Sequence, residues 1–276
     1  MHVARAGLGV GVVDGKIYAI GGFVANGVAT GANEVCDPAT DTWETKTPMP
    51  TPRAYITGNV VNGKIYIIGG DSNKTVNEIY DPETDSWATA ASMPTGSWGY
   101  ASAAIENEIY IIDSDLTQIY DVETNTWNLR APPPFGHLGY GKAGVTTGVN
   151  AVKRIYVLGE KVYDQPALNQ VYDPQNDKWT QGSAVPTYRR NFGVAVVDDL
   201  IFVVGGYTMK GVGISEYIKT GEMHEYTFYA TNEQYVPFGY GTPDPSYDGT
   251  APEVVVASPQ NKTYYTTNIT LNFTVN

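Results

Sequence analysis

Hydrophobic and polar positions repeat along this chain with a period of 44 to 48 residues. Each copy has a hydrophobic run, a short polar turn and a second hydrophobic run that often ends in two glycines. The copies are VVDGKIYAIGG, VVNGKIYIIGG, AIENEIYIIDS, AVKRIYVLGE and VVDDLIFVVGG, anchored on Ile17, Ile65, Ile109, Ile155 and Ile201. Such a period is typical of repeat architectures in which each repeat is one supersecondary unit.

A second element follows four of the five runs and carries a Trp at constant spacing. Its copies are NEVCDPATDTW, NEIYDPETDSW, TQIYDVETNTW and NQVYDPQNDKW, with Asp37–Trp43, Asp81–Trp87, Asp121–Trp127 and Asp173–Trp179 each six residues apart. In three copies the Asp precedes a Pro, a dipeptide that favours turn initiation. The spacing therefore predicts a hairpin whose second strand contains the Trp.

Each repeat predicts four short strands. Asp14-Gly15 and Asn62-Gly63 are dipeptides that suit a two-residue hairpin between the first and second strands. The second and third strands are hydrophobic on both faces, as expected when both faces are covered by other sheets. Because one such sheet cannot bury both its faces alone, the repeats are expected to pack around a common axis as an all-β propeller.

With these motifs in place, the chain resembles the kelch-repeat β-propellers over residues 1–238. The resemblance implies that the first strand of each blade is innermost and that the repeated Gly and Trp residues are structural. These residues are Gly21, Gly22, Gly69, Gly70, Gly205, Gly206, Trp43, Trp87, Trp127 and Trp179. The third repeat departs with Asp113-Ser114 in place of the two glycines, and the first has Cys36 where the others have Tyr.

The C-terminal part of the chain departs from the repeat. Residues 239–252 are rich in Pro, Gly and Asp and are expected to form a linker. Residues 253–276 resemble the opening strands of an Ig-like module of prokaryotic or archaeal surface proteins. The fifth repeat has no Trp strand, and Met1 aligns with Met49, so we expect the strand that closes the fifth blade to come from upstream.

The charge composition narrows the choice of partners. The chain has 17 Lys and Arg against 29 Asp and Glu, a net charge of −12, which disfavours nucleic acids and anionic membranes. No hydrophobic run is long enough to span a bilayer, so direct membrane insertion is not expected. Three of the four glycosylation sequons lie at Asn261, Asn268 and Asn272, which favours an extracellular or cell-surface protein.

Candidate ligand residues come from the start of each first strand, which the resemblance places at the mouth of the central channel. Arginines at this register contact acidic ligands in some kelch adaptors. The opposing hypothesis is that each Arg bonds loop carbonyls and braces neighbouring blades. Tyr55 lies near the same mouth, where aromatic side chains suit glycan stacking. The ligand-face candidates are Arg5, Arg53, Ser97, Trp98, His137, Arg189, Arg190 and Tyr207.

Enzymatic motifs are weak in this sequence. The stretch Gly136–Ala143 approaches a phosphate-binding loop but has Ala143 where a Ser or Thr would bind Mg²⁺. We expect no catalytic residue, metal or cofactor. Three functions stay open: a secreted or cell-surface recognition module for protein or glycan, a structural spacer of a surface layer, and a carbohydrate-active enzyme such as an oxidase related to galactose oxidase or a sugar epimerase.

Overall fold

The computed structural model describes most of the chain, as β-strands and one short 3₁₀ helix. The described residues are 1–134, 142–146, 148–159, 168–187, 189, 191–211, 224–228, 230, 232–237, 239–241, 254–255 and 274–275. The chain divides into two compact units, Met1–Gly141 and Lys142–Asn276, which we describe separately.

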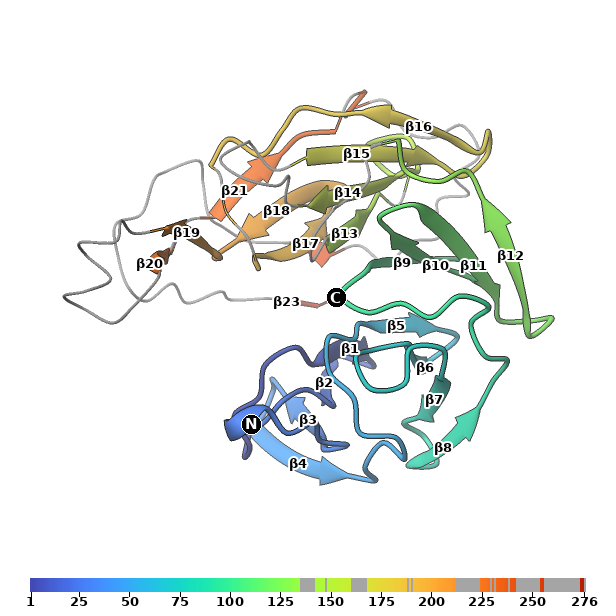
Figure 1. Cartoon of the computed structure of the whole chain (residues 1–276), viewed down its shortest axis with the longest axis vertical. Coiled ribbons are helices and arrows are strands. Elements are labelled where there is room, and N and C mark those ends of the chain that lie inside the picture. Colours follow the sequence, from blue (N-terminus) through green and yellow to red (C-terminus); the bar gives the residue numbers. More distant parts are fainter. Residues whose placement is uncertain are drawn as a thin grey trace. The chain divides into compact units, whose positions relative to one another are not determined.

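The first unit contains three four-stranded antiparallel sheets, which we call blades one to three (Figure 1). In each blade the strands follow one another in chain order. Blade one contains β1 (Gly9–Val13), β2 (Lys16–Ile20), β3 (Asn33–Asp37) and β4 (Thr42–Lys46), with the 3₁₀ helix Ala25–Gly27 between β2 and β3. Blade two contains β5 (Gly58–Val61), β6 (Lys64–Ile68), β7 (Asn77–Asp81) and β8 (Ser86–Thr89). Blade three contains β9 (Ala101–Ile105), β10 (Glu108–Asp113), β11 (Leu116–Asp121) and β12 (Thr126–Arg130).

The second unit contains blade four, which has four strands, and blade five, which has three among the described residues. Blade four contains β13 (Lys142–Val145), β14 (Ile155–Gly159), β15 (Leu168–Asp173) and β16 (Lys178–Gln181). Blade five contains β17 (Gly193–Val197), β18 (Leu200–Val204) and β21 (Asn232–Tyr235). A separate hairpin, β19 (Tyr207–Gly211) with β20 (His224–Phe228), lies between β18 and β21 in the chain. The short strands β22 (Val254–Val255) and β23 (Thr274–Val275) pair with each other, and the rest of the predicted Ig-like segment 253–276 lies outside the described residues.

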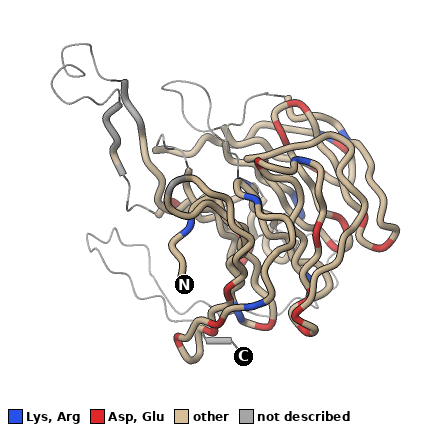
Figure 2. Tube along the Cα trace, turned by 60° about the horizontal axis from the view of Figure 1, so that its bottom comes forward, with Lys and Arg blue, Asp and Glu red and all other residues tan. Residues whose placement is uncertain are grey.

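The turns follow the predicted chemistry. Asp14 and Asn62 have φ of 50° and are followed by glycines with φ of 70° and 73°. Positive φ at both positions characterises the two-residue hairpin whose twist matches that of the strands. The Asp-to-Trp hairpins also form as expected, with Cys36 opposite Trp43 and Tyr80 opposite Trp87. Acidic residues gather at the turns, whereas Lys and Arg are few and scattered (Figure 2).

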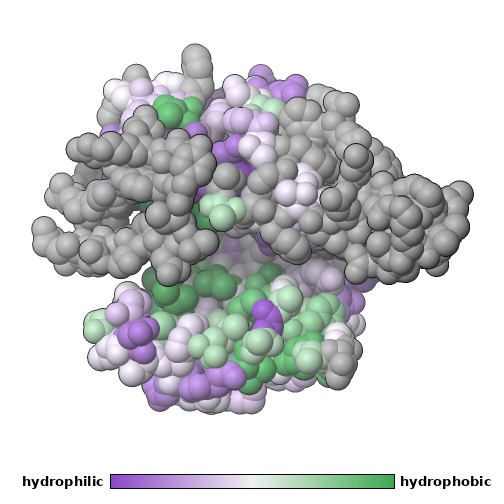
Figure 3. All heavy atoms as spheres, turned by 90° about the vertical axis from the view of Figure 1, so that its left-hand side faces the viewer, coloured by the Kyte–Doolittle hydropathy of each residue, from purple (hydrophilic) through white to green (hydrophobic). Residues whose placement is uncertain are grey.

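The cores lie between adjacent blades, which contact one another through their first strands: β1 packs beside β5 and β5 beside β9 in the first unit, and β13 beside β17 in the second. One cluster joins Tyr18 and Ile20 of blade one to Ile65 and Tyr80 of blade two, with Trp87 packed against it. Cys36 is buried at the Tyr position of blade one. The lower part of Figure 3 shows the surface of the first blades, where many hydrophobic residues are exposed.

Main-chain carbonyls connect neighbouring blades in the first unit. The Thr47 carbonyl accepts hydrogen bonds from Asn33 Nδ2 of blade one (3.2 Å) and from Trp87 Nε1 of blade two (2.9 Å). The Ala91 carbonyl likewise accepts from Asn77 Nδ2 of blade two and Trp127 Nε1 of blade three. Trp87 and Trp127 therefore each hold their blade to the one before it.

Candidate recognition surface

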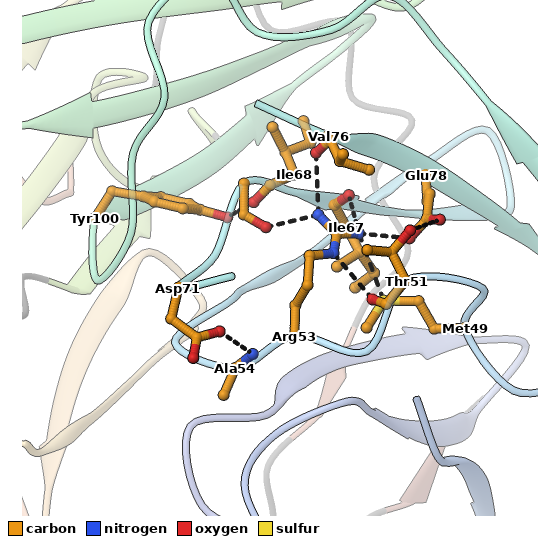
Figure 4. Close-up of polar contacts among 11 residues, drawn as sticks. Met49, Thr51, Arg53, Ala54, Ile67, Ile68, Asp71, Val76, Glu78 and Tyr100 are labelled. Atoms are coloured by element: carbon orange, nitrogen blue, oxygen red, sulfur yellow. Dashed lines mark hydrogen bonds and ion pairs between the residues drawn. The ribbon is translucent and has the colours of Figure 1, made fainter. Parts of the chain in front are cut away.

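Arg53 lies at the entry edge of blade two, by which we mean the edge where the first strand of a blade begins, the second ends and the third begins. Its side chain is fully buried (Figure 4). Nη1 donates to the Gly69 and Val76 carbonyls at 2.6 and 3.0 Å. Nη2 donates to Glu78 Oε2 at 2.7 Å and to the Ile67 carbonyl at 3.3 Å. The guanidinium group thus holds together the ends of β6 and β7.

Arg5 and Arg189 repeat this arrangement in blades one and five. Arg5 donates to the Gly21 and Ala32 carbonyls and to Glu34, and its side chain is also fully buried. Arg189 donates to the Gly205 carbonyl and to Glu233. Burial lowers the pKa of Arg5 and Arg53, and the adjacent carboxylates oppose this shift.

These contacts bear on the prediction that the arginines form an anion-attracting ring. A guanidinium group with no exposed surface, already paired with a carboxylate and loop carbonyls, cannot present its donors to a ligand in solution. The geometry corrects the placement of Arg5, Arg53 and Arg189 on the ligand face. It favours the opposing hypothesis that they brace the scaffold.

The main chain at the same register also joins adjacent blades. The Arg53 carbonyl accepts a hydrogen bond from Gly22 N of blade one, and the Ser97 carbonyl accepts one from Gly70 N of blade two. At Gly21 a Cβ would lie 2.7 Å from the Arg53 carbonyl oxygen. The two repeated glycines are therefore required by positive φ and by the close approach of the next blade.

Blade three replaces every part of this arrangement. Ser97 stands in the Arg position and is buried, and its hydroxyl group bonds to Asp113, which stands in the first Gly position. Gln118 takes the place of the buried Glu and exchanges hydrogen bonds with the main chain of Thr95 at 2.9 and 2.8 Å. Ser97 therefore also lies within the scaffold.

Exposed aromatic side chains lie beside these buried groups. Tyr55 is 38% exposed and Trp98 is 42% exposed. The Tyr55 ring contacts Trp98 with a centroid distance of 5.5 Å and Phe23 with a distance of 5.3 Å. The interplanar angles are 58° and 76°, so the ring planes are strongly inclined to one another. We call Phe23, Tyr55 and Trp98, which come from blades one, two and three, the aromatic shelf.

Tyr55 has an unusual backbone conformation, with φ of 52°. The equivalent residues of blades one, three and five also have positive φ, but they are Gly7, Gly99 and Asn191. Gly and Asn adopt this region readily, whereas a bulky side chain there is uncommon and carries a local cost of about 1–2 kcal/mol. Tyr55 is therefore the one described member of this repeat position whose side chain conflicts with its backbone.

Charged residues lie at the same entry edges as the aromatic shelf. Lys74 Nζ lies 5.8 Å from the centroid of the Trp98 ring. Asp71 Oδ1 accepts a hydrogen bond from the main-chain N of Ala54, the residue before Tyr55. Asp115 is exposed in the turn between β10 and β11 at the entry edge of blade three.

The other predicted ligand residues lie in the second unit or outside the described residues. In blade five, Asn191 Nδ2 donates to the Tyr207 hydroxyl group at 3.1 Å. His137 and Arg190 are outside the described residues. Across the part of the chain that the structure describes, no group of three or more His, Cys, Asp or Glu has the geometry of a metal site. No described helix has the length and hydrophobicity needed to cross a membrane.

Phe23 and Lys74 were not predicted from the sequence. Phe23 follows Gly21-Gly22 directly, at the position that Asp71 holds after Gly69-Gly70. Comparison of the repeats position by position is the signal that could have found it, because an aromatic residue replaces an acidic residue there.

Comparisons with known proteins agree with this architecture. A family profile described as the Kelch motif matches residues 4–50, 52–94 and 188–223. The solved structure of YjhT superposes with a TM-score of 0.64 at 16% identity, covering 84% of this chain and 82% of that one. The fold is thus a β-propeller of kelch repeats, and the all-β propeller predicted from the sequence is confirmed.

Relatives of known sequence support a kelch-repeat family for this chain. Kelch-like protein 15 of Danio rerio is 25% identical over 211 residues, which are 76% of this chain and 32% of the relative. An Influenza virus NS1A-binding protein homolog of Mus musculus is 39% identical over 72 residues, 26% of this chain and 11% of the relative. This chain therefore spans between about a tenth and a third of the length of these relatives.

Proposed function

We propose that this protein is a non-enzymatic recognition module, secreted or exposed on a cell surface, that binds a protein or a glycan at the entry edge of its blades. The observation that carries the proposal is Tyr55, a bulky residue kept in a left-handed backbone conformation where the equivalent described positions have Gly or Asn. Backbone strain of this kind concentrates at functional sites, because the surrounding structure must compensate for it.

The position of Tyr55 supports a binding role. It lies between two other aromatic side chains that come from different blades, so a rigid scaffold holds all three rings in place. Aromatic side chains with a polar margin are typical of recognition surfaces, where few rotatable bonds become fixed on binding. One relative bears the name Influenza virus NS1A-binding protein homolog, which supports a protein partner.

The buried arginines sharpen the proposal by exclusion. Because Arg5, Arg53 and Arg189 are internal, binding at this edge cannot depend on their charge. The recognition chemistry must come from the exposed side chains, chiefly the aromatic shelf and the variable loops beside it. The clustered sequons of residues 261–274 support export of the protein.

Site-specific crosslinking tests the proposal. A photoactivatable residue would replace exposed Lys74 at the entry edge or, as the matched control, exposed Glu83 in the turn between β7 and β8 at the opposite edge. In cells of the source organism, we expect a discrete adduct from position 74 and none from position 83. Equal crosslinking at the two positions, or crosslinking confined to position 83, would contradict recognition at the entry edge. Surface biotinylation of the same cells tests the location.

A further inference from the structure

We infer that the aromatic shelf binds a positively charged side chain, a Lys or Arg in a basic segment of a protein partner. This inference rests on the proposed function and names the chemistry of its ligand. The three rings Phe23, Tyr55 and Trp98 would hold the cation through their faces, and acidic residues beside them would provide the opposing charge.

The ring geometry suits a cation. A cation is attracted to the electron-rich face of an aromatic ring within about 6 Å of its centroid, and Trp and Tyr are the better rings. Phe23 and Tyr55 meet edge to face, and Tyr55 and Trp98 are tilted by 58°, so neither pair is stacked in parallel. Tyr55 and Trp98 also keep 38% and 42% of their surface exposed.

The protein itself places a cation on this shelf. Lys74 Nζ lies 5.8 Å from the centroid of the Trp98 ring, within the range of a cation–π contact. Lys74 is exposed on the link between β6 and β7, so it marks the ring face as one that accepts an ammonium group from solvent. This contact is the observation that distinguishes a cationic ligand from a neutral sugar.

The surrounding charge points the same way. Arg5 and Arg53 are buried and paired with Glu34 and Glu78, so they do not repel an approaching cation as free charges would. Lys74 is the exposed cation at the shelf, and the incoming side chain would take its place over the Trp98 ring. Asp71 and exposed Asp115 lie at the same edge. The whole chain carries a net charge of −12, which favours association with a basic partner and disfavours an acidic one.

A pair of peptides separates this inference from general electrostatic attraction. The probe is a labelled hexapeptide with two lysines, compared with the same peptide acetylated at both Nζ atoms, and binding to the full chain is followed by fluorescence anisotropy. Acetylation removes the charge and keeps the length. We expect the acetylated peptide to bind about five- to thirty-fold more weakly.

Three single variants test whether the peptide binds at the aromatic shelf, and none of them changes the charge of the protein. Tyr55→Asn removes the ring but suits the positive φ, as Asn191 does in blade five, so the variant should fold and lose affinity at least about fivefold. Tyr55→Phe should keep most of the affinity. Tyr240→Asn removes a Tyr that is 37% exposed in the second unit and should leave affinity unchanged.

Each other result counts against the inference. Equal binding of the two peptides, absence of binding, or equal loss in the Tyr55→Asn and Tyr240→Asn variants would overturn it. Binding of a neutral hexasaccharide that depends on Tyr55, without preference for the charged peptide, would overturn it in favour of a glycan. If crosslinking from position 74 succeeds while these tests fail, the proposed function stands and only the ligand chemistry is wrong.

Discussion

Blades two and three perform the same structural task with different chemistry at their entry edges. Blade two uses a buried ion pair, Arg53 with Glu78, next to Gly69. Blade three uses neutral Ser97 with Gln118 and places Asp113 in the Gly position. The residues change as a set, because an Arg without its carboxylate, or the reverse, would leave a buried charge without compensation.

The comparison of the two blades shows that the residue at the Arg position goes with the length of the link between the second and third strands. In blade two the guanidinium group donates to four main-chain carbonyls, those of Thr51, Ile67, Gly69 and Val76, so it organises the entry segment and two strand ends at once. In blade three the two strand ends are joined by the short turn of Ser114 and Asp115, which leaves less main chain to organise. A smaller polar group is then sufficient.

The largest expected difference between the two blades comes from removing the residue at the Arg position. Arg53→Ala leaves Glu78 buried without its partner and should lower the free energy of unfolding by about 3–5 kcal/mol. Ser97→Ala removes one hydrogen bond to Asp113 and should cost about 1–2 kcal/mol. Urea unfolding of both variants measures the difference, with an unchanged m-value as the control. Equal losses would show that the ion pair is not what holds blade two.

A smaller difference is expected at the first Gly position. Gly69 has φ of 64°, and an added Cβ would lie 2.6 Å from the Ser97 carbonyl oxygen, so Gly69→Asp should cost at least about 2 kcal/mol. The reverse change in blade three, Asp113→Gly, removes an acceptor of Ser97 and should cost about 1 kcal/mol. Thermal unfolding of the two single variants checks this order. If Gly69→Asp lowers the stability no more than Asp113→Gly does, the first Gly position of blade two has no stricter requirement than that of blade three.

The smallest effect is expected at the buried tyrosines opposite the Trp residues. The Tyr80 hydroxyl group donates to Asp85 Oδ1 and the Tyr120 hydroxyl group donates to Asn125 Oδ1, both at 2.7 Å. Burial raises the pKa of Tyr80, and Asp85 raises it further. Burial also raises the pKa of Tyr120, to about 12.

A raised pKa in the folded state stabilises the protein below the unfolded value of about 10, and this contribution is lost as the pH rises through the folded value. The free energy of unfolding should therefore fall between pH values of about 10 and about 12, and less steeply in Tyr120→Phe than in the unsubstituted protein. Tyr80→Phe should likewise reduce the slope. Urea unfolding over this pH range measures both slopes. Parallel slopes in all three proteins would rule out these hydroxyl groups as the cause.

The sequence predicted the blades because their determinants are local. Asp14 and Asn62 set hairpin turns through their own φ, and the Asp-to-Trp spacing set the pairing of Tyr80 with Trp87. Blade five has three strands among the described residues, and the origin of its fourth strand stays a prediction. The boundaries at residues 238 and 252 stay predictions.

The candidate site was harder to predict, because exposure depends on contacts between distant residues. Spacing alone places Arg53 at the start of a strand, but its burial depends on Glu78, 25 residues later. The signal was present, since Glu34, Glu78 and Glu233 accompany the three arginines and Gln118 accompanies Ser97. The sequence marks Tyr55 only as an aromatic residue near the channel mouth, because its left-handed backbone has no signature in one repeat considered alone.

The shared carbonyls of Thr47 and Ala91 have a consequence for how such a chain can grow. Each accepts one hydrogen bond from an Asn of its own blade and one from a Trp of the next. The acceptor is a main-chain carbonyl, so any residue type can supply it. Here one is supplied by Thr47 and the other by Ala91. A duplicated repeat would bring its own Asn and Trp donors and meet an acceptor that is already in place. Because the contact between blades uses a main-chain acceptor, a duplicated blade can be added and the loop sequences can diverge without loss of this hydrogen bond.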